Sequence, residues 1–304
     1  MFPYISLYSV NALCGNERFV IHFFISFHSI FYFFIQADIG QAIKLGVHVE
    51  NFLRCEELVI PPDTLDYKVE LRIRDTENRV LDLMVHILSG LGGSLKLTIS
   101  APFWLVNRSG LPLVFRQDGA EAPAAGQFEE HEVARSVTPL LFSYADKEQS
   151  ERCVMRLGTK LKGGMHHSKY CQRFSLQRGC GVRPVHVVNS DPMRPDWVYN
   201  IGIDVRQGRG RYRDTNIVTF SPRYQLDNRS SHKLVFAQKH LAVRGEPLRG
   251  TDYFSALQNC TVSFHWPRVD LDQLLSVRMV DVPEVDWSGG VRIDQVDSFH
   301  INMR

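Results

Sequence analysis

The chain has 304 residues, of which 44% are hydrophobic and 22% are charged, and its formal net charge is +2 at pH 7. This composition is typical of a folded soluble protein with enough length for two or three domains. The small net charge implies neither a nucleic acid nor an anionic membrane as a partner. The cysteines form no CxxC pair, which argues against a zinc knuckle or a disulfide framework and favours reduced, mostly buried thiols in a cytosolic protein. They are Cys14, Cys55, Cys153, Cys171, Cys180 and Cys260.

The N-terminal part differs from the rest of the chain. Residues 19–35 (FVIHFFISFHSIFYFFI) carry no formal charge and include seven phenylalanines. This run only just reaches the length of a membrane helix, and residues 1–16 lack the basic start of a secretory signal. Three interpretations stay open: a marginal membrane anchor, a buried pair of strands, or a stretch that is not native to the fold. We therefore set residues 1–65 apart as an N-terminal segment of doubtful origin, in which Ile39 to Leu53 shows a weak helical pattern.

From Asp66 onward, short apolar runs alternate with turn residues. In YKVELRIRD (67–75), Val69, Leu71 and Ile73 point to one face and charged side chains to the other, which indicates a half-buried strand. Many short strands at this spacing predict an all-β fold, a β-sandwich or a barrel. The other predicted strands are 79–88, 94–100, 102–107, 111–117, 138–144, 152–158, 182–188, 198–206, 216–221, 233–238 and 274–281.

Two segments of the chain repeat each other. Residues 97–117 (LTISAPFWLVNRSGLPLVFRQ) align without a gap with residues 218–238 (VTFSPRYQLDNRSSHKLVFAQ), at an offset of 121 residues (107 to 228). Ten of the 21 positions are identical, which indicates one supersecondary unit used twice, as in a repeat array. The identical pairs are Thr98/Thr219, Ser100/Ser221, Leu105/Leu226, Asn107/Asn228, Arg108/Arg229, Ser109/Ser230, Leu113/Leu234, Val114/Val235, Phe115/Phe236 and Gln117/Gln238.

Each copy reads as a strand, an Asn-Arg-Ser corner and a second strand. Asparagine at a corner can adopt a left-handed backbone and hydrogen-bond the neighbouring main chain through its amide. We therefore expect Asn107 and Asn228 to have a structural role, with direct contact to a ligand as the alternative.

The repeat suggests how the chain is divided. Weaker similarity extends downstream of both copies, and residues 198–220 close the first copy with strands that the second lacks. After residues 1–65 we expect the closing strands of a preceding repeat (66–100), a complete β-sandwich repeat (101–221) and a truncated second repeat (222–304). An open sandwich leaves unpaired strand edges, so we expect the parent protein to be longer.

Several longer strings resemble a known family. They are APFWLVNRSGLPLVFRQ, QFEEHEVARSVTPLLFSYADKEQ, YNIGIDVRQGRGRYRDT, PRYQLDNRSSHKLVFAQ and WSGG…SFHINMR. In order and spacing they resemble the adaptor-binding domain, also called the SHR-binding domain, of the vacuolar protein sorting 13 family, in particular its D-type branch. The resemblance covers roughly residues 66–304.

This resemblance implies a fragment of a bridge-like lipid-transfer protein, in which other parts of the chain pass phospholipid between organelles at contact sites. The family's adaptor-binding domain is an array of six β-sandwich repeats, each with a characteristic asparagine, and Asn107 and Asn228 match it. It implies organelle adaptors with Pro-x-Pro motifs as partners, without enzyme activity, cofactor or nucleic acid. It also implies a cytoplasmic, peripheral location at contact sites of the mitochondrion, endoplasmic reticulum, endosome, Golgi or peroxisome.

Aromatic side chains are the candidates for a peptide pocket. An extended proline-containing peptide binds along a sheet edge or in a groove between repeats, where aromatic rings line shallow pockets. Each candidate also suits a core position. They are Tyr224, Tyr253, Phe254, Trp266 and Trp287.

Other patterns have weaker functional interpretations. His166 and His167 lie near Cys171 and Cys180, but the spacing fits no standard site, so no metal is expected. Residues 206–213 (RQGRGRYR) form a basic hairpin, which is either a solvated turn or a contact for lipid head groups or an acidic partner. No P-loop, GxGxxG, GxSxG or HExxH pattern occurs in the sequence.

Glycosylation patterns leave one alternative function open. Asn107, Asn228 and Asn259 each begin an Asn-x-Ser/Thr triplet. Together with residues 19–35 they allow a membrane-tethered or secreted β-sandwich that binds carbohydrate or protein outside the cell.

Overall fold

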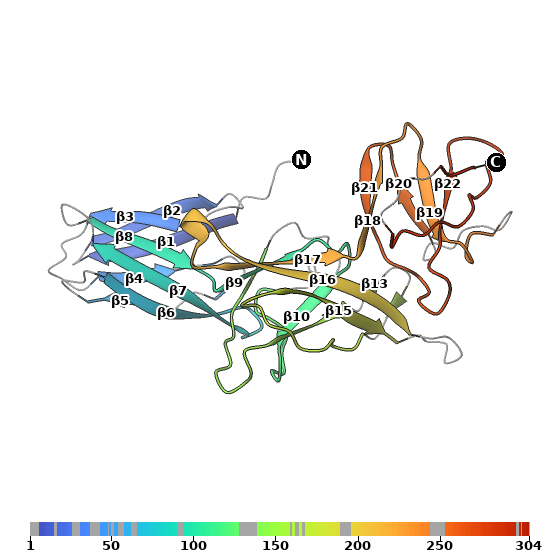
Figure 1. The fold of residues 1–304 in the computed structure, drawn as a ribbon. Helices are drawn as coiled ribbons and strands as arrows, with labels where there is room; N and C mark the ends of the chain where they lie inside the picture. Colours follow the sequence, from blue (N-terminus) through green and yellow to red (C-terminus); the bar gives the residue numbers. More distant parts are fainter. Residues whose placement is uncertain are drawn as a thin grey trace.

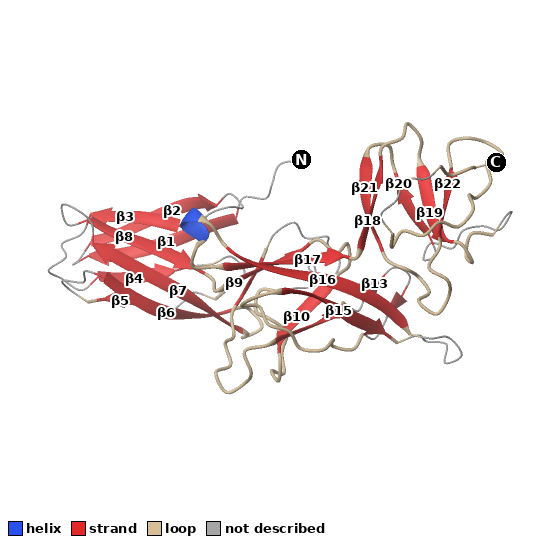
Figure 2. Ribbon diagram, viewed as in Figure 1, coloured by secondary structure: helices blue, strands red, loops and turns tan. Residues whose placement is uncertain are grey.

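The computed structural model is built almost wholly of β-strands, which confirms the predicted all-β fold (Figure 1). The one helical element in the described part of the chain is a 3-10 turn at Gly210–Tyr212 (Figure 2). No helix in that part is both long and apolar enough to cross a membrane. The residues that the structure describes are 6–14, 17–25, 31–36, 43–47, 49, 52–53, 58–61, 66–89, 94–127, 139–158, 160–161, 164–165, 168–188, 196–243, 253–295, 298 and 300–303.

Three groups of strands follow one another along the chain, and we call them the first, second and third units (Figure 1). The first unit contains two four-stranded sheets, with the orders β2-β1-β4-β5 and β3-β8-β7-β6. Its strands are β1 (Ser6–Cys14), β2 (Glu17–Ile25), β3 (Phe31–Gln36), β4 (Ile43–Val47), β5 (Leu58–Ile60), β6 (Asp66–Arg74), β7 (Val80–Ser89) and β8 (Ser94–Ser100).

The phenylalanine-rich run lies in strands of two different sheets. β2 pairs antiparallel with β1, and β3 pairs antiparallel with β8. The two strands of the run therefore do not pair with each other.

The weak helical pattern at Ile39 to Leu53 was a wrong prediction, because Ile43–Val47 forms β4 between β1 and β5. Ile43, Leu45 and Val47 also fit the two-residue period of a strand, so a segment this short does not separate the two patterns. Gly46 and the β-branched residues weaken a helix, and neighbouring strands supply main-chain partners.

The second unit is a sandwich of two sheets. A five-stranded sheet of order β11-β9-β17-β16-β15 faces the pair β10-β12. Phe115 and Phe220 meet in the core between them, with ring centres 4.6 Å apart. The strands are β9 (Phe103–Asn107), β10 (Leu113–Gln117), β11 (Leu140–Phe142), β12 (Cys153–Leu157), β13 (Lys160–Leu161), β14 (Gly164–Met165), β15 (Cys180–Val187), β16 (Trp197–Gln207) and β17 (Asn216–Pro222).

The third unit repeats the pairing of the second. β18 pairs with β21 as β9 pairs with β11, and β19 pairs with β22 as β10 pairs with β12. The internal sequence repeat is therefore a structural repeat as well. The strands are β18 (Tyr224–Asn228), β19 (Leu234–Gln238), β20 (Tyr253–Ala256), β21 (Cys260–Phe264) and β22 (Leu275–Met279).

An irregular segment covers the outer edge of β12 and of β22 in the same way. The Cys171 amide donates to the Met155 oxygen (2.8 Å), as the Ser288 amide donates to the Val277 oxygen (2.9 Å). The Met155 and Val277 amides in turn donate to the Cys171 thiol (3.5 Å) and the Ser288 hydroxyl (2.9 Å). Cys171 therefore has a structural role that a serine takes in the next unit.

Candidate functional site

The corner after β9 is closed by the side chain of Asn107. Its Nδ2 donates to the Leu111 oxygen (2.7 Å), and its Oδ1 accepts from the amide (3.0 Å) and the hydroxyl (2.7 Å) of Ser109. The Ser109 hydroxyl accepts from the Leu111 amide (3.2 Å). The side-chain amide thus replaces the main-chain partners that the turn lacks.

Asn228 makes the same bonds after β18 and adds two more. Its Nδ2 donates to the His232 oxygen (2.8 Å), and its Oδ1 accepts from the amide (3.0 Å) and hydroxyl (2.7 Å) of Ser230. The same Nδ2 lies within hydrogen-bond distance of the Ala256 and Leu257 oxygens, at 3.2 and 2.9 Å. Asn228 is buried and therefore ties the end of β20 to the corner.

The left-handed backbone expected at these two asparagines is absent. Among the described non-glycine residues, positive φ occurs at Asn78, Asn259 and Glu284. The hydrogen bonds of the amide close the turn without it, so the left-handed prediction was wrong. Because the Asn107 and Asn228 amides are bonded to the main chain, two of the three glycosylation triplets offer no free amide in the folded chain.

Gln117 and Gln238 close a second repeated turn. Gln117 Nε2 donates to the Asp146 oxygen (2.7 Å), and its Oε1 accepts from the Asp146 amide (3.1 Å). Gln238 makes the same pair of bonds with Arg268, at 2.8 and 3.1 Å. This role was not predicted from the sequence, although the identity of Gln117 and Gln238 in the two copies of the repeat was a signal for it.

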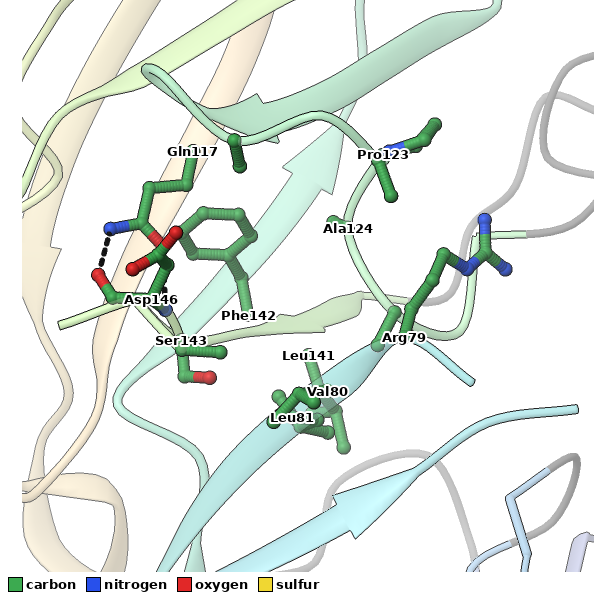
Figure 3. Close-up of a pocket in the computed structure, with 14 residues that line it drawn as sticks. Arg79, Val80, Leu81, Gln117, Pro123, Ala124, Leu141, Phe142, Ser143 and Asp146 are labelled. Atoms are coloured by element: carbon green, nitrogen blue, oxygen red, sulfur yellow. Dashed lines mark hydrogen bonds between the residues drawn. The ribbon is translucent and has the colours of Figure 1, made fainter. Parts of the chain in front are cut away.

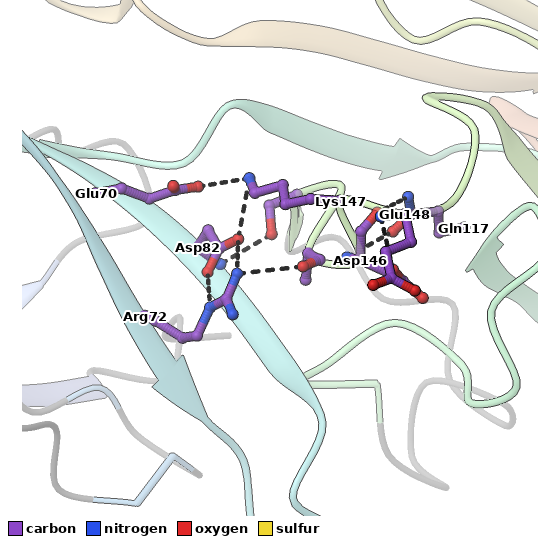
Figure 4. Close-up of polar contacts among 9 residues, drawn as sticks. Glu70, Arg72, Asp82, Gln117, Asp146, Lys147 and Glu148 are labelled. Atoms are coloured by element: carbon purple, nitrogen blue, oxygen red, sulfur yellow. Dashed lines mark hydrogen bonds and ion pairs between the residues drawn. The ribbon is translucent and has the colours of Figure 1, made fainter.

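Charged side chains hold the first unit against the second (Figure 4). Asp82 on β7 accepts from Arg72 Nε (2.8 Å), and its amide donates to the Ser143 hydroxyl (2.8 Å) just after β11. Lys147 lies 2.7 Å from Glu70 and 3.3 Å from Asp82. Burial disfavours the charge of Asp82, but the hydrogen bonds and charges of Arg72 and Lys147 outweigh it, so the Asp82 pKa is lowered.

A buried carboxylate, Asp75, makes a second contact between the same two units. Its Oδ2 accepts from Arg79 Nε (2.7 Å) and from the Gly126 amide of the second unit (3.0 Å), and its Oδ1 accepts from the Arg79 amide (2.8 Å). Burial alone would raise the pKa of Asp75, but these donors and the Arg79 charge lower it overall. Asp75 is therefore an ionised buried group.

A cavity of about 210 Å³ lies at this junction (Figure 3). Its apolar lining includes Leu81, Ala124 and Phe142, with Arg79 on one side and Asp146 on the other. No histidine, cysteine or lysine belongs to the lining, which comes entirely from described residues. The cavity can take an apolar side chain, and it offers no nucleophile with an adjacent base.

The junction between the second and third units uses a histidine in place of Ser143. His265 follows β21 as Ser143 follows β11; its Nε2 lies 3.1 Å from the Ser109 oxygen, and its ring packs edge-on against Tyr199 at 5.4 Å. A Cβ on Gly110 would lie 2.9 Å from the Ser263 Cβ, so the two units approach closely there. Burial lowers the pKa of His265, which is therefore neutral at the junction.

Acid should weaken this junction. A histidine with a lowered folded pKa stabilises the fold above its unfolded value of about 6.5, and stability is lost as the pH falls below that value because the unfolded chain then binds more protons. We expect the melting temperature to fall between about pH 7.5 and about pH 5.5. The variant His265→Gln, which keeps a donor for the Ser109 oxygen, should show a shallower fall in a thermal melt. Equal slopes for the two proteins would contradict the assignment.

Comparison with known proteins decides the family. The family model described as "Vacuolar-sorting associated protein 13, adaptor binding domain" matches residues 26–304. The chain belongs to this adaptor-binding domain family. The match begins inside the phenylalanine-rich run and so includes residues 26–65, which the resemblance read from the sequence did not cover.

Relatives of this adaptor-binding domain are very large proteins. The intermembrane lipid transfer protein VPS13D of Homo sapiens is 54% identical over 272 residues, 88% of this chain and 6% of the human protein. Vps13D of Drosophila melanogaster is 38% identical over 268 residues, 88% of this chain and 7% of the fly protein. VPS13 of Chaetomium thermophilum is 24% identical over 205 residues, which are 63% of this chain and 6% of that protein. Both animal relatives are D-type members, as the resemblance implied.

The five aromatic candidates of this adaptor-binding domain do not meet at one place. Tyr224, Phe254 and Trp266 pack around Phe264, with ring centres 6.5, 4.9 and 4.8 Å from its ring. They belong to the core of the third unit. The other two lie toward opposite edges of the sheet β20-β19-β22: Tyr253 is half-buried on β20, and Trp287, whose ring faces the Arg278 guanidinium at 5.1 Å, lies beyond β22.

The loop that contains His166, His167, Cys171 and Cys180, where no metal is expected from the sequence, is only partly described. His166 and His167 lie outside the described residues, and within those residues no group of three or more His, Cys, Asp or Glu could hold a metal. Burial raises the pKa of the Cys171 thiol, whereas Cys180 is exposed. Of the cysteines that the structure describes with side chains, Cys153 and Cys171 are buried and the other two are not.

Proposed function

We propose that this chain is an adaptor-recognition part of a lipid-transfer scaffold, which recruits its parent protein to organelle membranes at contact sites. The observation that carries the proposal is the match of residues 26–304 to the adaptor-binding domain of vacuolar-sorting associated protein 13. The relatives are intermembrane lipid transfer proteins, and the chain spans 6 to 7% of the animal ones. Phospholipid is therefore assigned to other parts of the parent protein, and recognition to this part.

The build of the chain supports binding rather than catalysis. The Asn corner and the Gln-closed turn recur in the second and third units, and polar contacts fix each junction. Such an array presents several sheet edges in a fixed relation, which suits recognition of extended segments. We propose a cytoplasmic, peripheral position, in which the adaptor selects the mitochondrion, endoplasmic reticulum, endosome, Golgi or peroxisome.

We also propose that residues 66–100 are the closing strands of a preceding repeat, followed by a complete repeat (101–221) and by residues 222–304, which belong to the next repeat. β6, β7 and β8 lie next to one another in their sheet as β15, β16 and β17 do in theirs. The strand that follows each triplet in its sheet differs in direction. β9 runs parallel to β17, whereas β3 runs antiparallel to β8. This difference supports treating β3 as distinct from the opening strand of a repeat.

We propose that the partner is an organelle adaptor with a short Pro-x-Pro segment. Prolines preset the extended conformation and so reduce the entropy lost on binding. β20 is one of the two outer strands of the sheet β20-β19-β22 and carries the half-buried Tyr253. An extended segment beside β20 would gain main-chain hydrogen bonds and contact with this ring.

A peptide titration tests this proposal. Fluorescent Pro-x-Pro peptides should bind the chain saturably in an anisotropy assay, and Tyr253→Ala should weaken binding by about tenfold, the loss of one aromatic contact. Met84→Ala, which removes an exposed apolar side chain from the first unit, is the matched control and should bind as the native chain does. Lack of saturable binding would overturn the adaptor assignment. Equal loss in both variants would overturn the placement at β20.

A further inference from the structure

The loop between β16 and β17 is an arginine hairpin, by which we mean residues 206–213. It contains four arginines and no acidic residue within eight positions, in a chain whose formal net charge is +2. The Arg206 and Arg213 side chains are 80% and 72% exposed, and Arg209 is exposed beside the 3-10 turn shown in Figure 2. The loop therefore carries a local excess of positive charge.

The hairpin is a fixed structure and not a loose loop. Gln207 Nε2 donates to the Arg213 oxygen (2.9 Å), and the Gly208 amide donates to the Thr215 oxygen (2.9 Å). A Cβ at Gly208 would overlap the Tyr212 oxygen, so the turn requires glycine there. These contacts define the directions in which the main chain presents its arginines.

The base of the hairpin is anchored to the strand link between the first and second units. The buried Thr215 hydroxyl donates to the Ala101 oxygen (2.7 Å), and the Asn216 amide donates to the Pro102 oxygen (2.9 Å). The Tyr212 ring packs on Trp104 on β9, with ring centres 5.2 Å apart. Such anchoring lowers the ordering cost of binding at the arginines.

A fifth arginine from another segment borders the hairpin. Arg178 is exposed and precedes Gly179, whose oxygen accepts from the Val205 amide (3.1 Å) on β16. The neighbouring carboxylates are Asp204, which lies 2.6 Å from Arg206, Asp214, which lies 3.9 Å from Arg213, and Glu151, which accepts from Gln177 (2.8 Å). The five arginines of this surface therefore outnumber the three neighbouring carboxylates. Exposed pairs of this kind are weak and can exchange a carboxylate for a phosphate.

We propose that the arginine hairpin with Arg178 is a contact surface for an anionic lipid bilayer. Guanidinium groups bind phosphate in a bidentate manner, and the surface charge of a bilayer needs no groove or side-chain match. A Cβ on Gly210, at the tip, would meet no atom within 4 Å, so the tip is open to a broad partner. The proposal rests on the proposed function only in assuming that an organelle membrane lies within reach of the chain.

Vesicle flotation tests this surface in the absence of any adaptor. The chain should float with phosphatidylcholine vesicles that contain phosphatidylserine and not with phosphatidylcholine alone. Each arginine near an anionic surface contributes about fivefold to partitioning, so Arg209→Ala with Arg211→Ala should reduce binding by about 25-fold. Added salt should weaken binding, because the screening length shortens. The matched control is Lys68→Ala with Arg292→Ala, which removes the same charge from exposed positions outside the surface and should bind like the native chain.

The outcomes separate this proposal from adaptor recognition. Equal flotation of the two double variants, or no flotation of the native chain, overturns the membrane contact and leaves the peptide titration unaffected. Binding to labelled polyglutamate without flotation also overturns it, in favour of an acidic protein partner. Failure of the peptide titration with retained, hairpin-dependent flotation would leave the membrane contact standing alone.

Discussion

Replacing Asn228 with alanine is expected to lower the free energy of unfolding by about 3 to 4 kcal/mol, because several main-chain groups lose their partner at once. The amide binds the oxygens of His232, Ala256 and Leu257 and accepts twice from Ser230. Asn228 is 1% exposed, so water cannot replace these bonds without opening the third unit. Urea denaturation followed by tryptophan fluorescence should show a lower midpoint with an unchanged slope.

The matched comparison is Asn107→Ala in the second unit. Asn107 donates to one oxygen and is only partly buried, so the expected loss is smaller, about 1 to 2 kcal/mol. The difference between the two losses in unfolding free energy measures how much the extra hydrogen bonds of Asn228 to β20 contribute to stability. Equal losses would mean that those bonds add nothing, and a loss below about 1 kcal/mol for Asn228→Ala would contradict its role at the corner.

Most strands from Asp66 onward could be predicted because alternation and repetition indicate the same elements, whereas β1 to β5 were not among the predicted strands. β6 was predicted at 67–75 and spans Asp66–Arg74, where Leu71 and Ile73 are buried and Arg72 and Arg74 are exposed. One buried face of a sheet imposes this period directly on the sequence. The repeat predicted a strand on each side of the corner in both copies, and these strands are β9 and β10 in one copy and β18 and β19 in the other.

The details that failed depend on contacts that local patterns do not contain. Asparagine at a corner is compatible with both a left-handed backbone and a side-chain turn, and only the position of Ser109 and Ser230 decides between them. The aromatic candidates were ambiguous for the same reason. Phe254 and Trp266 look alike in the sequence whether they line a pocket or pack around Phe264.

The junctions between units were beyond prediction, because their partners are far apart in the chain and follow no period. Asp82 and Ser143 are 61 residues apart, and His265 and Ser109 are 156 apart. Ser143 and His265 occupy equivalent places in two units, yet they differ in size and chemistry. The two junctions therefore share the position of a hydrogen bond but not the residue that makes it. A search for identical residues in the two repeats cannot detect such a position.

The second large effect is expected from Asp75→Ala, which should lower the free energy of unfolding by about 3 to 5 kcal/mol. The Arg79 side chain is 7% exposed, and its Nε is bound by Asp75 at 2.7 Å. Alanine removes this carboxylate from the buried guanidinium, which keeps an ion pair with the exposed Glu77, 3.2 Å from its Nη1. It also removes the acceptor of the Gly126 amide, so the first unit loses a contact to the second. Urea denaturation measures the loss. The surface variant Asp204→Ala, which breaks the exposed pair with Arg206, should cost about 0 to 1 kcal/mol in the same assay.

The pH dependence of the unfolding free energy distinguishes the buried Asp75–Arg79 ion pair from an apolar contact. The folded pKa of Asp75 is lowered, so its stabilising effect is fully present above its unfolded value of about 3.9 and is lost as the pH falls through the folded value. Asp82 is lowered as well, by Arg72 and Lys147, and acts in the same direction. The native chain should therefore lose stability steeply below about pH 4, and Asp75→Ala should lose less over that range because one of the two carboxylates is already gone. If the urea midpoints of the native chain and the variant fall in parallel, the pKa of Asp75 is not lowered in the fold and its ion pair with Arg79 within the first unit is ruled out.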